Sequence, residues 1–339
     1  MGPHKIILLA LWSLTFSLQA VAGDSISIFD FCSEFDSLAI HIKTDIRQLL
    51  RKKDEYIPAH ITISSQQGVV LETDAEIRTR GNARKAVCYV PPVKLRFGKE
   101  YLRSLGHLEY PTIKVVNTCS LTDLHEGYVW SEYTVYQLNQ LFTPRSFRTK
   151  LISLSYEDTE EKKKPMSFDG FLIEHEDQLA DRIRGTVYDL RYFQETILHR
   201  ESYLEFCMFQ YMIGNTDWKI LNRHNVRIIR VSEEKAVYPI AYDFDYAGLV
   251  NTHYAVPHES LPLENVRDRL YVGPCFTEEE LWIVRDLFLQ RKDQIFHVLD
   301  KSRLEEKAKK SATKYIEEFF AELKDDRQAL SIFVKCRNN

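Results

Sequence analysis

The chain has 339 residues, enough for one large domain or two small ones. Its 45 lysines and arginines nearly balance 49 aspartates and glutamates, so the charge gives no sign of a nucleic-acid partner or a lipid-headgroup surface. Hydrophobic residues make up 44% of the chain, which is ordinary for a globular protein and excludes a disordered or fibrous class.

The N-terminus has the pattern of a secretory signal peptide. After a short basic start, an apolar run extends from Ile6 to Leu18, and Ala20-Val21-Ala22 forms a small-x-small cleavage site. An uncleaved membrane anchor is the alternative, although the apolar run is shorter than the roughly 20 residues that a membrane-spanning helix needs. We predict that residues 1–22 are removed and that the mature chain is secreted or otherwise extracytoplasmic. No later segment is apolar enough to cross a membrane, so no membrane span is expected in the mature chain.

All the cysteines follow the expected cleavage site: Cys32, Cys88, Cys119, Cys207, Cys275 and Cys336. Export permits disulfides and an even count is compatible with them, so we expect at least one. The wide, irregular spacings do not match a zinc site. The preferred pair is Cys88–Cys119, because both residues flank expected strands. Cys207 lies in an apolar helical stretch and is expected to be a buried thiol.

Apolar spacing divides the rest of the chain into four parts. Residues 23–58 are expected to form a helical extension, since Ser33–Lys53 has the spacing of a helix. Residues 59–175 are mainly strand-like, residues 176–325 are mainly helical, and residues 326–339 form a C-terminal tail.

The individual elements follow from periodicity and from the residues at their ends. The expected strands are Ala59–Ser64, Val69–Glu72, Glu76–Arg80, Val93–Phe97, Tyr110–Thr118, Thr149–Tyr156 and Gly170–His175. The expected helices are Asp123–Phe142, Val187–Leu198, Glu201–Ile213, Phe276–Leu299 and Ser302–Lys324.

A basic turn interrupts the expected strands. Arg80-Gly81-Asn82 ends one strand, and Lys94 lies in the returning strand. Glycine lets the backbone approach a ligand closely, and Arg80, Arg84 and Lys94 are suited to phosphate oxygens. A surface hairpin with solvated basic residues is the alternative for this stretch alone.

Carboxylates and amides gather at both ends of an expected hairpin, whose strands are Val226–Ile229 and Val237–Tyr242. Asp217, Asn222 and Asn225 precede the first strand, while Asp243 and Asp245 follow the second, so the hairpin should bring the two groups together. These hard oxygen ligands suit Mg²⁺. A solvated hairpin whose polar residues serve turns is the alternative.

With Gly214-Asn215-Thr216-Asp217, Tyr242-Asp243-Phe244-Asp245 and Arg80-Gly81-Asn82, the chain resembles the spore-coat CotH kinase-like family. More distantly, it is similar to HipA-type and phosphoinositide kinases. The resemblance covers roughly residues 60–300, although the specific motifs are only those three segments. It implies an α+β, two-lobed protein-kinase-like fold with a mainly β N-lobe and a mainly helical C-lobe.

The resemblance also implies a nucleotide site. In kinases, an acid on a helix pairs with a lysine on a strand and orients it toward the nucleotide phosphates. The resemblance gives this lysine's role to Lys114, with Glu126 or Glu132 as its partner. A lysine extending from an edge strand into solvent is the alternative. Glu174 falls where the hinge between kinase lobes would lie. The cofactor-binding set is thus Arg80, Gly81, Lys94, Lys114, Glu126 and Glu174.

The same resemblance implies the catalytic and metal residues. Asp217 would accept or orient the proton of the attacking hydroxyl, Asp243 would hold Mg²⁺ or Mn²⁺, and Asp245 would bind a second metal or anchor the loop. In kinases the metal-binding Asn lies five residues after the catalytic Asp, which selects Asn222. That Asn also lies directly before a strand, which selects Asn225, and we favour Asn225. The motif departs from kinases in lacking His-Arg-Asp and in having Asp-Phe-Asp for Asp-Phe-Gly.

The expected function is therefore that of an exported kinase-like enzyme that moves a phosphoryl group from ATP to an unknown protein or glycan acceptor. A pseudokinase or other nucleotide-binding module without turnover, a nucleotidyl (AMP) transferase and a metallophosphoesterase remain alternatives. The last requires further upstream motifs that the chain lacks in the right order.

Overall fold

The computed structural model describes residues 27–81, 83–106, 110–119, 126–188 and 194–336. The expected signal peptide and the first residues of the helix expected from Asp123 lie outside this part of the chain.

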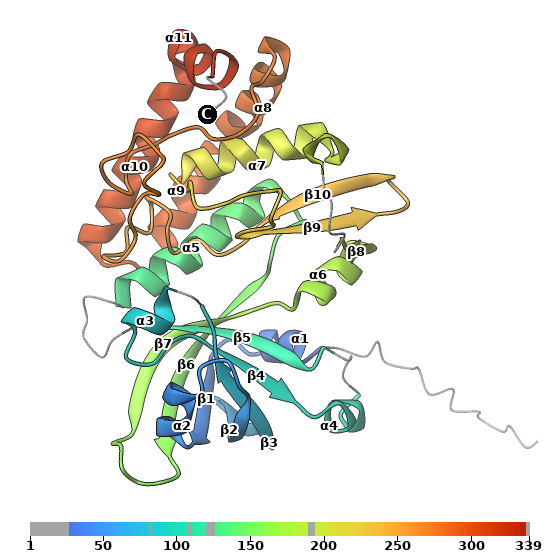
Figure 1. Ribbon diagram of the computed structural model, residues 1–339, viewed down its shortest axis with the longest axis vertical. Coiled ribbons are helices and arrows are strands. Elements are labelled where there is room, and N and C mark those ends of the chain that lie inside the picture. The colour runs from blue at the N-terminus through green and yellow to red at the C-terminus, as the bar shows by residue number, and fades with distance from the viewer. Residues whose placement is uncertain (1–26, 82, 107–109, 120–125, 189–193, 337–339) are drawn as a thin grey trace, which may run out of the picture.

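Seven strands of the N-terminal half close into a mixed β-barrel (Figure 1). Around the barrel they are ordered β1 (Leu38–Thr44), β2 (Ile57–Ser65), β3 (Gly68–Thr79), β4 (Val93–Phe97), β5 (Thr112–Asn117), β7 (Met166–Ile173) and β6 (Thr149–Asp158). Neighbouring strands are antiparallel except β1 and β6, which pair in parallel and so close the barrel. Closure leaves no exposed strand edge.

Short helices surround the barrel. They are α1 (Ile28–Ser33), α2 (Ile46–Arg51), α3 (Arg84–Val87) and α4 (Lys99–Ser104). α1 begins at a capping box, in which the Ser27 side chain accepts from the backbone of Asp30 and the Asp30 carboxylate accepts from Ser27. α3 lies between the barrel and the first long helix, α5 (Glu126–Phe142).

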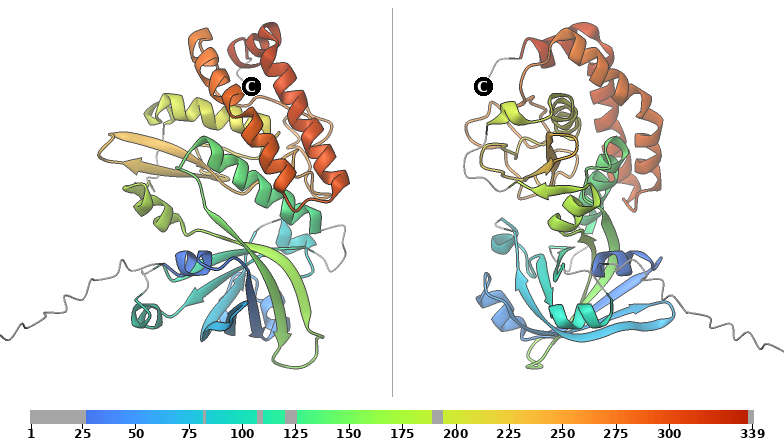
Figure 2. Two further views of the ribbon diagram at one scale, coloured as in Figure 1. Left: turned by 180° about the vertical axis from the view of Figure 1, so that it is seen from behind. Right: turned by 90° about the vertical axis from the view of Figure 1, so that its right-hand side faces the viewer.

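The C-terminal half combines a three-stranded sheet with helices. The sheet has the order β10 (Ala236–Ala241), β9 (Val226–Val231) and β8 (Gly185–Val187). The helices are α6 (Glu176–Arg182), a 3-10 turn (Glu195–Ile197), α7 (Arg200–Met212), α8 (Glu278–Gln290), α9 (Lys292–Lys301), α10 (Glu306–Lys324), α11 (Asp326–Ala329) and a π-helical turn (Leu330–Val334). Figure 2 shows α8 and α11 at the end of this half far from the barrel, whereas α9 and α10 run along its flank toward α5.

Two hydrophobic cores meet at β5 and β7. The barrel core contains Val115 and Leu172, while the second core contains Val116 and Phe171. Alternation of side chains along a strand produces this division, because successive residues point to opposite faces. The outward face of β5, which also carries Lys114, therefore faces the C-terminal half.

The expectation of a two-lobed protein-kinase-like fold is wrong. The chain is α+β, but its core is a closed seven-stranded mixed barrel, accompanied by a three-stranded sheet and C-terminal helices. The barrel includes β1, which lies inside the segment Ser33–Lys53 that was expected to be helical. Leu38, Ile40 and Ile42 alternate with more exposed residues, a strand period that the helical interpretation missed.

Two disulfides join described cysteines. Cys88–Cys119 confirms the preferred pair, and Cys275–Cys336 ties the end of the chain to the segment before α8. Cys207 is a buried free thiol as expected, and so is Cys32. Disulfides are consistent with an extracytoplasmic compartment. Among the described residues, no helix has both the length and the apolar character needed to span a bilayer.

Candidate functional site

The β9–β10 hairpin places Asn225 beside Asp243. The strands pair with Val226 opposite Ala241, and the ladder continues as Tyr242 N donates to Asn225 O over 3.2 Å. Both Asn225 and Asp243 have left-handed backbones, with φ of 50° and 62°. Asn and Asp tolerate this region better than other non-glycine residues, and such conformations concentrate at functional sites. The predicted pairing of the two strands as a hairpin is confirmed, and it places Asn225 opposite Tyr242, the residue before Asp243.

A buried asparagine holds the loop that carries Asp217. Asn215 is 2% exposed, and its side chain accepts from Asp217 N over 3.0 Å and donates to Gln210 on α7. Its carbonyl accepts from the indole of Trp218 over 3.1 Å. Asp217 therefore has a position fixed by the end of α7.

Asp217 contacts residues on both sides. Asn225 Nδ2 donates to its carboxylate and to its carbonyl, each over 2.8 Å. His224 Nε2 lies 2.9 Å from the other carboxylate oxygen. The carboxylate is about one-third exposed, so solvent and a substrate hydroxyl can reach it. His224 was not among the predicted site residues.

The structure separates the roles of the two candidate amides. Asn222 is exposed, and its side-chain oxygen accepts from His224 N over 3.1 Å, which is a local turn contact. Asn225 instead lies between Asp217 and the start of the Asp243 segment. This arrangement favours Asn225 over Asn222 as the amide at the site.

Lys114 is a buried cation without a hydrogen bond. It is 8% exposed, and no described residue accepts from its ammonium group. Burial, followed by the nearby positive charge of Arg80, lowers the pKa of Lys114 to about 7, while the charge of Glu176 opposes the shift. Its nitrogen lies 4.4 Å from the centre of the Tyr242 ring.

Three cations converge on Tyr242, the residue before Asp243. Besides Lys114, the Arg227 guanidinium lies 4.6 Å from the ring centre, and Arg80 donates to the Tyr242 hydroxyl. Arg80 also lies 4.0 Å from the Asp243 carboxylate. Arg227 was missed from sequence, although it lies in β9 only two residues after Asn225.

A row of basic residues crosses the barrel face behind these cations. Arg78 on β3 is opposite Lys94 on β4, and Lys94 is opposite Lys114 on β5. Burial and the charge of Arg78 lower the pKa of Lys94. Like charges placed directly opposite each other destabilise a sheet, so the row indicates a site for an anion. Gly81, which follows Arg80, has φ of 82° and supplies the turn between β3 and α3.

The acid partner expected for Lys114 pairs elsewhere. Glu132 is 1% exposed and forms its ion pair with Arg84, which also donates to Asp245 Oδ2 over 3.0 Å. Burial raises the pKa of Glu132 to about 7, against the opposing effect of Arg84. Glu126 begins α5, but its side chain lies outside the part of the chain that the structure describes.

Two further predicted residues have structural contacts. The buried carboxylate of Asp245 is bound by Arg84 and by the Tyr254 hydroxyl, which corresponds to the loop-anchoring role rather than a second metal. Glu174 is fully buried, and its carboxylate accepts from Arg148 and Arg182. In this conformation the contacts occupy Oδ2 of Asp245 and both carboxylate oxygens of Glu174.

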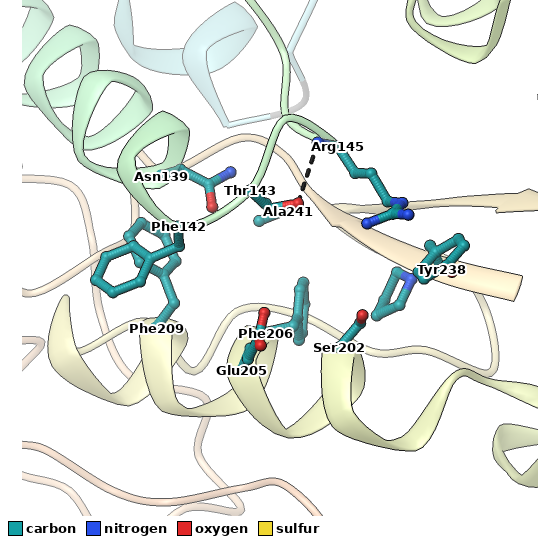
Figure 3. Close-up of a pocket in the computed structure, with 11 residues that line it drawn as sticks. Asn139, Phe142, Thr143, Arg145, Ser202, Glu205, Phe206, Phe209, Tyr238 and Ala241 are labelled. Carbon is teal, nitrogen blue, oxygen red and sulfur yellow. Dashed lines mark hydrogen bonds between the residues drawn. The ribbon is translucent and has the colours of Figure 1, made fainter. Parts of the chain in front are cut away.

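A small, partly open cavity lies elsewhere, between α5, α7 and β10 (Figure 3). Its volume is about 30 Å³, which admits water but not a nucleotide. Glu205 lines it, and burial followed by the charge of Glu201 raises the pKa of Glu205 to about 7.

The donors at the hairpin fit a divalent cation with few protein ligands. Within the described ranges, no cluster of three or more His, Cys, Asp or Glu residues forms a complete metal cage. Asp243 offers a partly exposed carboxylate, and Asn225, whose backbone oxygen accepts from the N–H of the preceding residue Tyr242, carries a side-chain amide oxygen directly before the adjoining strand. Mg²⁺ characteristically takes one or two carboxylates and completes its shell with water and phosphate.

Comparison with models of known protein families and with curated proteins finds no match to this chain.

Proposed function

We propose that this protein is an ATP-dependent phosphotransferase that modifies a hydroxyl of a protein or glycan acceptor. One observation carries the proposal: Lys114, Arg80 and Arg227 converge on Tyr242, directly before Asp243, and the Lys114 ammonium is buried without a hydrogen bond. A buried cation without an acceptor is costly unless a ligand supplies one. A nucleotide phosphate provides the needed charge and oxygen atoms.

The basic side chains have the positioning role in this proposal. Phosphoryl transfer depends mainly on holding the reactants in line and offsetting negative charge. Lys114 and Arg80 bind phosphate oxygens from the barrel side, and Arg227 binds them from the sheet side. Lys94 and Arg78 extend the positive field outward along the barrel.

Asp217 acts on the acceptor. Its carboxylate is accessible and held by Asn225 and His224, so it can orient a hydroxyl and accept its proton as the new phosphate bond forms. Asp243 and the amide oxygen of Asn225 would hold Mg²⁺ or Mn²⁺, which offsets phosphate charge when bound.

The proposed location is secreted or otherwise extracytoplasmic after signal-peptide cleavage. The two disulfides support such a compartment. The resemblance of the Arg80, Asp217 and Asp243 segments to the CotH kinase-like family supports the reaction class. The proposal rests on the side chains at the site and not on a kinase fold.

Incubation with γ-labelled and α-labelled ATP, with Mg²⁺ or Mn²⁺, tests the reaction. Transfer of the γ label to an added protein or glycan mixture is the expected result. Transfer of the α label would instead establish a nucleotidyl transferase, and release of free phosphate would indicate hydrolysis. Metal-dependent binding without any transfer would leave a nucleotide-binding module.

A further inference from the structure

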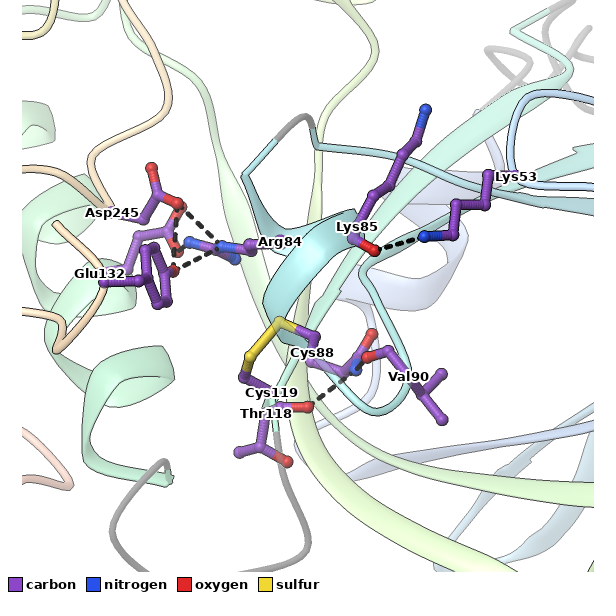
Figure 4. The surroundings of a disulfide bond; sticks show 11 residues. Lys53, Arg84, Lys85, Cys88, Val90, Thr118, Cys119, Glu132 and Asp245 are labelled. Atoms are coloured by element: carbon purple, nitrogen blue, oxygen red, sulfur yellow. Dashed lines mark hydrogen bonds and ion pairs between the residues drawn. A yellow bond between two sulfur atoms is a disulfide. The ribbon is translucent and has the colours of Figure 1, made fainter. Parts of the chain in front are cut away.

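Arg84 joins three segments that are distant in sequence. It lies on α3, and its Nε is 3.0 Å from both Asp245 Oδ2 and the Tyr254 hydroxyl oxygen. Its other end pairs with Glu132 on α5. Figure 4 shows the guanidinium directed from α3 toward both carboxylates. Arg84 therefore connects the loop of Arg80 to α5 and to the segment that follows β10.

The burial of this cluster makes Arg84 difficult to replace. The side chains of Arg84 and Glu132 are 8% and 1% exposed, and that of Asp245 is 9% exposed. Removing the Arg84 cation leaves the carboxylates of Glu132 and Asp245 close together and away from water. The protein relieves the repulsion between them by moving the segments apart or by taking up a proton. Asp245 follows Asp243 by two residues, so movement of this segment displaces the proposed metal ligand.

The Cys88–Cys119 disulfide holds α3 in place. Cys88 N donates to Arg84 O over 2.9 Å at the end of α3. The disulfide joins Cys88 to Cys119, which follows β5 and Thr118. Tyr89 N donates to Cys119 O over 2.9 Å, and Asn117 donates to Val90 O over the same distance. β5 carries Lys114, so the disulfide links the Arg84 helix to the strand of the phosphate-site lysine.

We propose that Arg84 is a positioning residue, which sets Asp243 against Lys114 through Asp245, and that the Cys88–Cys119 disulfide maintains it in that position. This inference rests on the proposed nucleotide site and adds the coupling between its two sides. It assigns the disulfide a role in ligand affinity as well as in stability.

A double-mutant cycle tests the path through Asp245 by calorimetric titration of Mg–ATP into the full chain. Arg84→Met should weaken affinity about 10–100-fold, as expected when the support of a metal ligand is lost. Arg84→Lys should restore part of that affinity. In the Asp245→Asn background, Arg84→Met should add little, because the same path is already broken. Additive losses, or wild-type affinity in folded Arg84→Met, would overturn the proposal.

The matched control is Arg200→Met, which removes the Arg200–Glu280 pair between α7 and α8 and should leave affinity unchanged. Hydrogen exchange of residues 242–252 provides a second measurement without nucleotide. Faster exchange of these residues in Arg84→Met, but not in Arg200→Met, would support the positioning role of Arg84. That support would hold even if the wild-type protein does not bind ATP, because absence of binding would defeat only the proposed function. Unchanged exchange would contradict the inference.

The disulfide is tested by Cys88→Ser/Cys119→Ser, with Cys275→Ser/Cys336→Ser as control. The first pair should weaken Mg–ATP binding and speed exchange of residues 242–252. The second should lower thermal stability only. Equal effects of the two cysteine pairs on binding and exchange would remove the disulfide from the proposal. If Arg84→Met does not fold, Arg84→Lys and the first cysteine pair test the positioning role of Arg84.

Discussion

Lys94 on β4 lies directly opposite Lys114 on β5, and no carboxylate separates them in the strand register. Such a pair destabilises a sheet in the absence of a ligand, and burial of Lys114 increases the cost. The barrel keeps these lysines on the face toward Tyr242 and Asp243. The proposed anionic ligand at that face would explain why the arrangement is tolerated, in addition to the nearby charge of Glu176.

The first prediction concerns Lys114 and pH. Its folded pKa, about 7, lies below the unfolded value, so the charged form opposes folding below pH 7 and this penalty fades as pH rises toward 10.5. Lys114→Met should therefore stabilise the ligand-free protein at pH 6, by roughly 1–3 kcal/mol, and less at pH 9. Urea unfolding at both pH values measures this.

The control is Lys43→Met, since Lys43 is an exposed strand lysine paired with Glu157 on the far part of the barrel. It should show no stabilisation at pH 6. If Lys114→Met is destabilising at pH 6, Lys114 has an acceptor in solution and the anion-site argument fails. Arg80, Lys94, Arg227 and Glu176 face Lys114 and stay unchanged in both variants.

Local patterns predicted the hairpin that carries the proposed site but not the fold that surrounds it. The hairpin was predictable, because the strands Val226–Val231 and Ala236–Ala241 follow one another in sequence with a short turn. Barrel closure was not, because β1 pairs with β6 more than a hundred residues away, as in Ile40 with Leu154. Nothing in the local pattern of either strand specifies that partner.

Charge pairing was similarly hard to predict. Glu126 or Glu132 was expected to pair with Lys114, yet Glu132 pairs with Arg84, because the α3 turn brings a second cation toward α5. The disulfide Cys88–Cys119 was predicted since both cysteines flank strands. Cys275–Cys336 was missed because only Cys88–Cys119 was singled out as a pair, whereas Phe333 of the C-terminal tail is buried beside Phe276.

The second prediction separates catalysis from binding. Asp217→Ala should leave Mg–ATP affinity within a few-fold of wild type, while γ-phosphoryl transfer falls by about 10²–10⁴-fold, the usual contribution of a general base. Titration calorimetry and label transfer measure the two effects. A parallel loss of affinity would mean that Asp217 holds the nucleotide instead of the acceptor.

The third prediction distinguishes the two asparagines. Asn225→Ala should weaken Mn²⁺–ATP binding by about 10–100-fold, because Asn225 contacts Asp217 and adjoins Asp243. Asn222→Ala removes only a turn contact to His224 N and should change affinity little. The opposite ranking would place the metal on the Asn222 side of the loop.

The fourth prediction concerns how the two site loops are joined. Gly248 N donates to Gly214 O over 3.0 Å, and the Tyr315 hydroxyl lies where a side chain at Gly214 would extend, 2.0 Å from its Cβ position. Gly214 also has φ of 64°. Gly214→Ala should destabilise the protein by more than the roughly 1–2 kcal/mol of a left-handed backbone alone.

Adding Tyr315→Phe should recover the part of that loss due to contact with the hydroxyl, as measured by urea unfolding. Gly127→Ala on α5 is the control, because among the described residues no atom outside its own helix backbone and chain neighbours lies within 4 Å of its Cβ position, and it should stabilise by about 0.4–1 kcal/mol. No recovery in the double variant would show that Tyr315 does not constrain the loops.

The central claim is that the cations around Tyr242 and the carboxylate of Asp243 form one nucleotide-phosphate site. Calorimetric titration of ATP with Mg²⁺, compared with ATP and EDTA, tests it most directly in wild type, Lys114→Met, Asp243→Ala and Lys43→Met. We predict binding in wild type and Lys43→Met that requires the metal, with at least about tenfold loss in Lys114→Met and Asp243→Ala. Binding that is absent from wild type, or equal in all four proteins, would contradict the account.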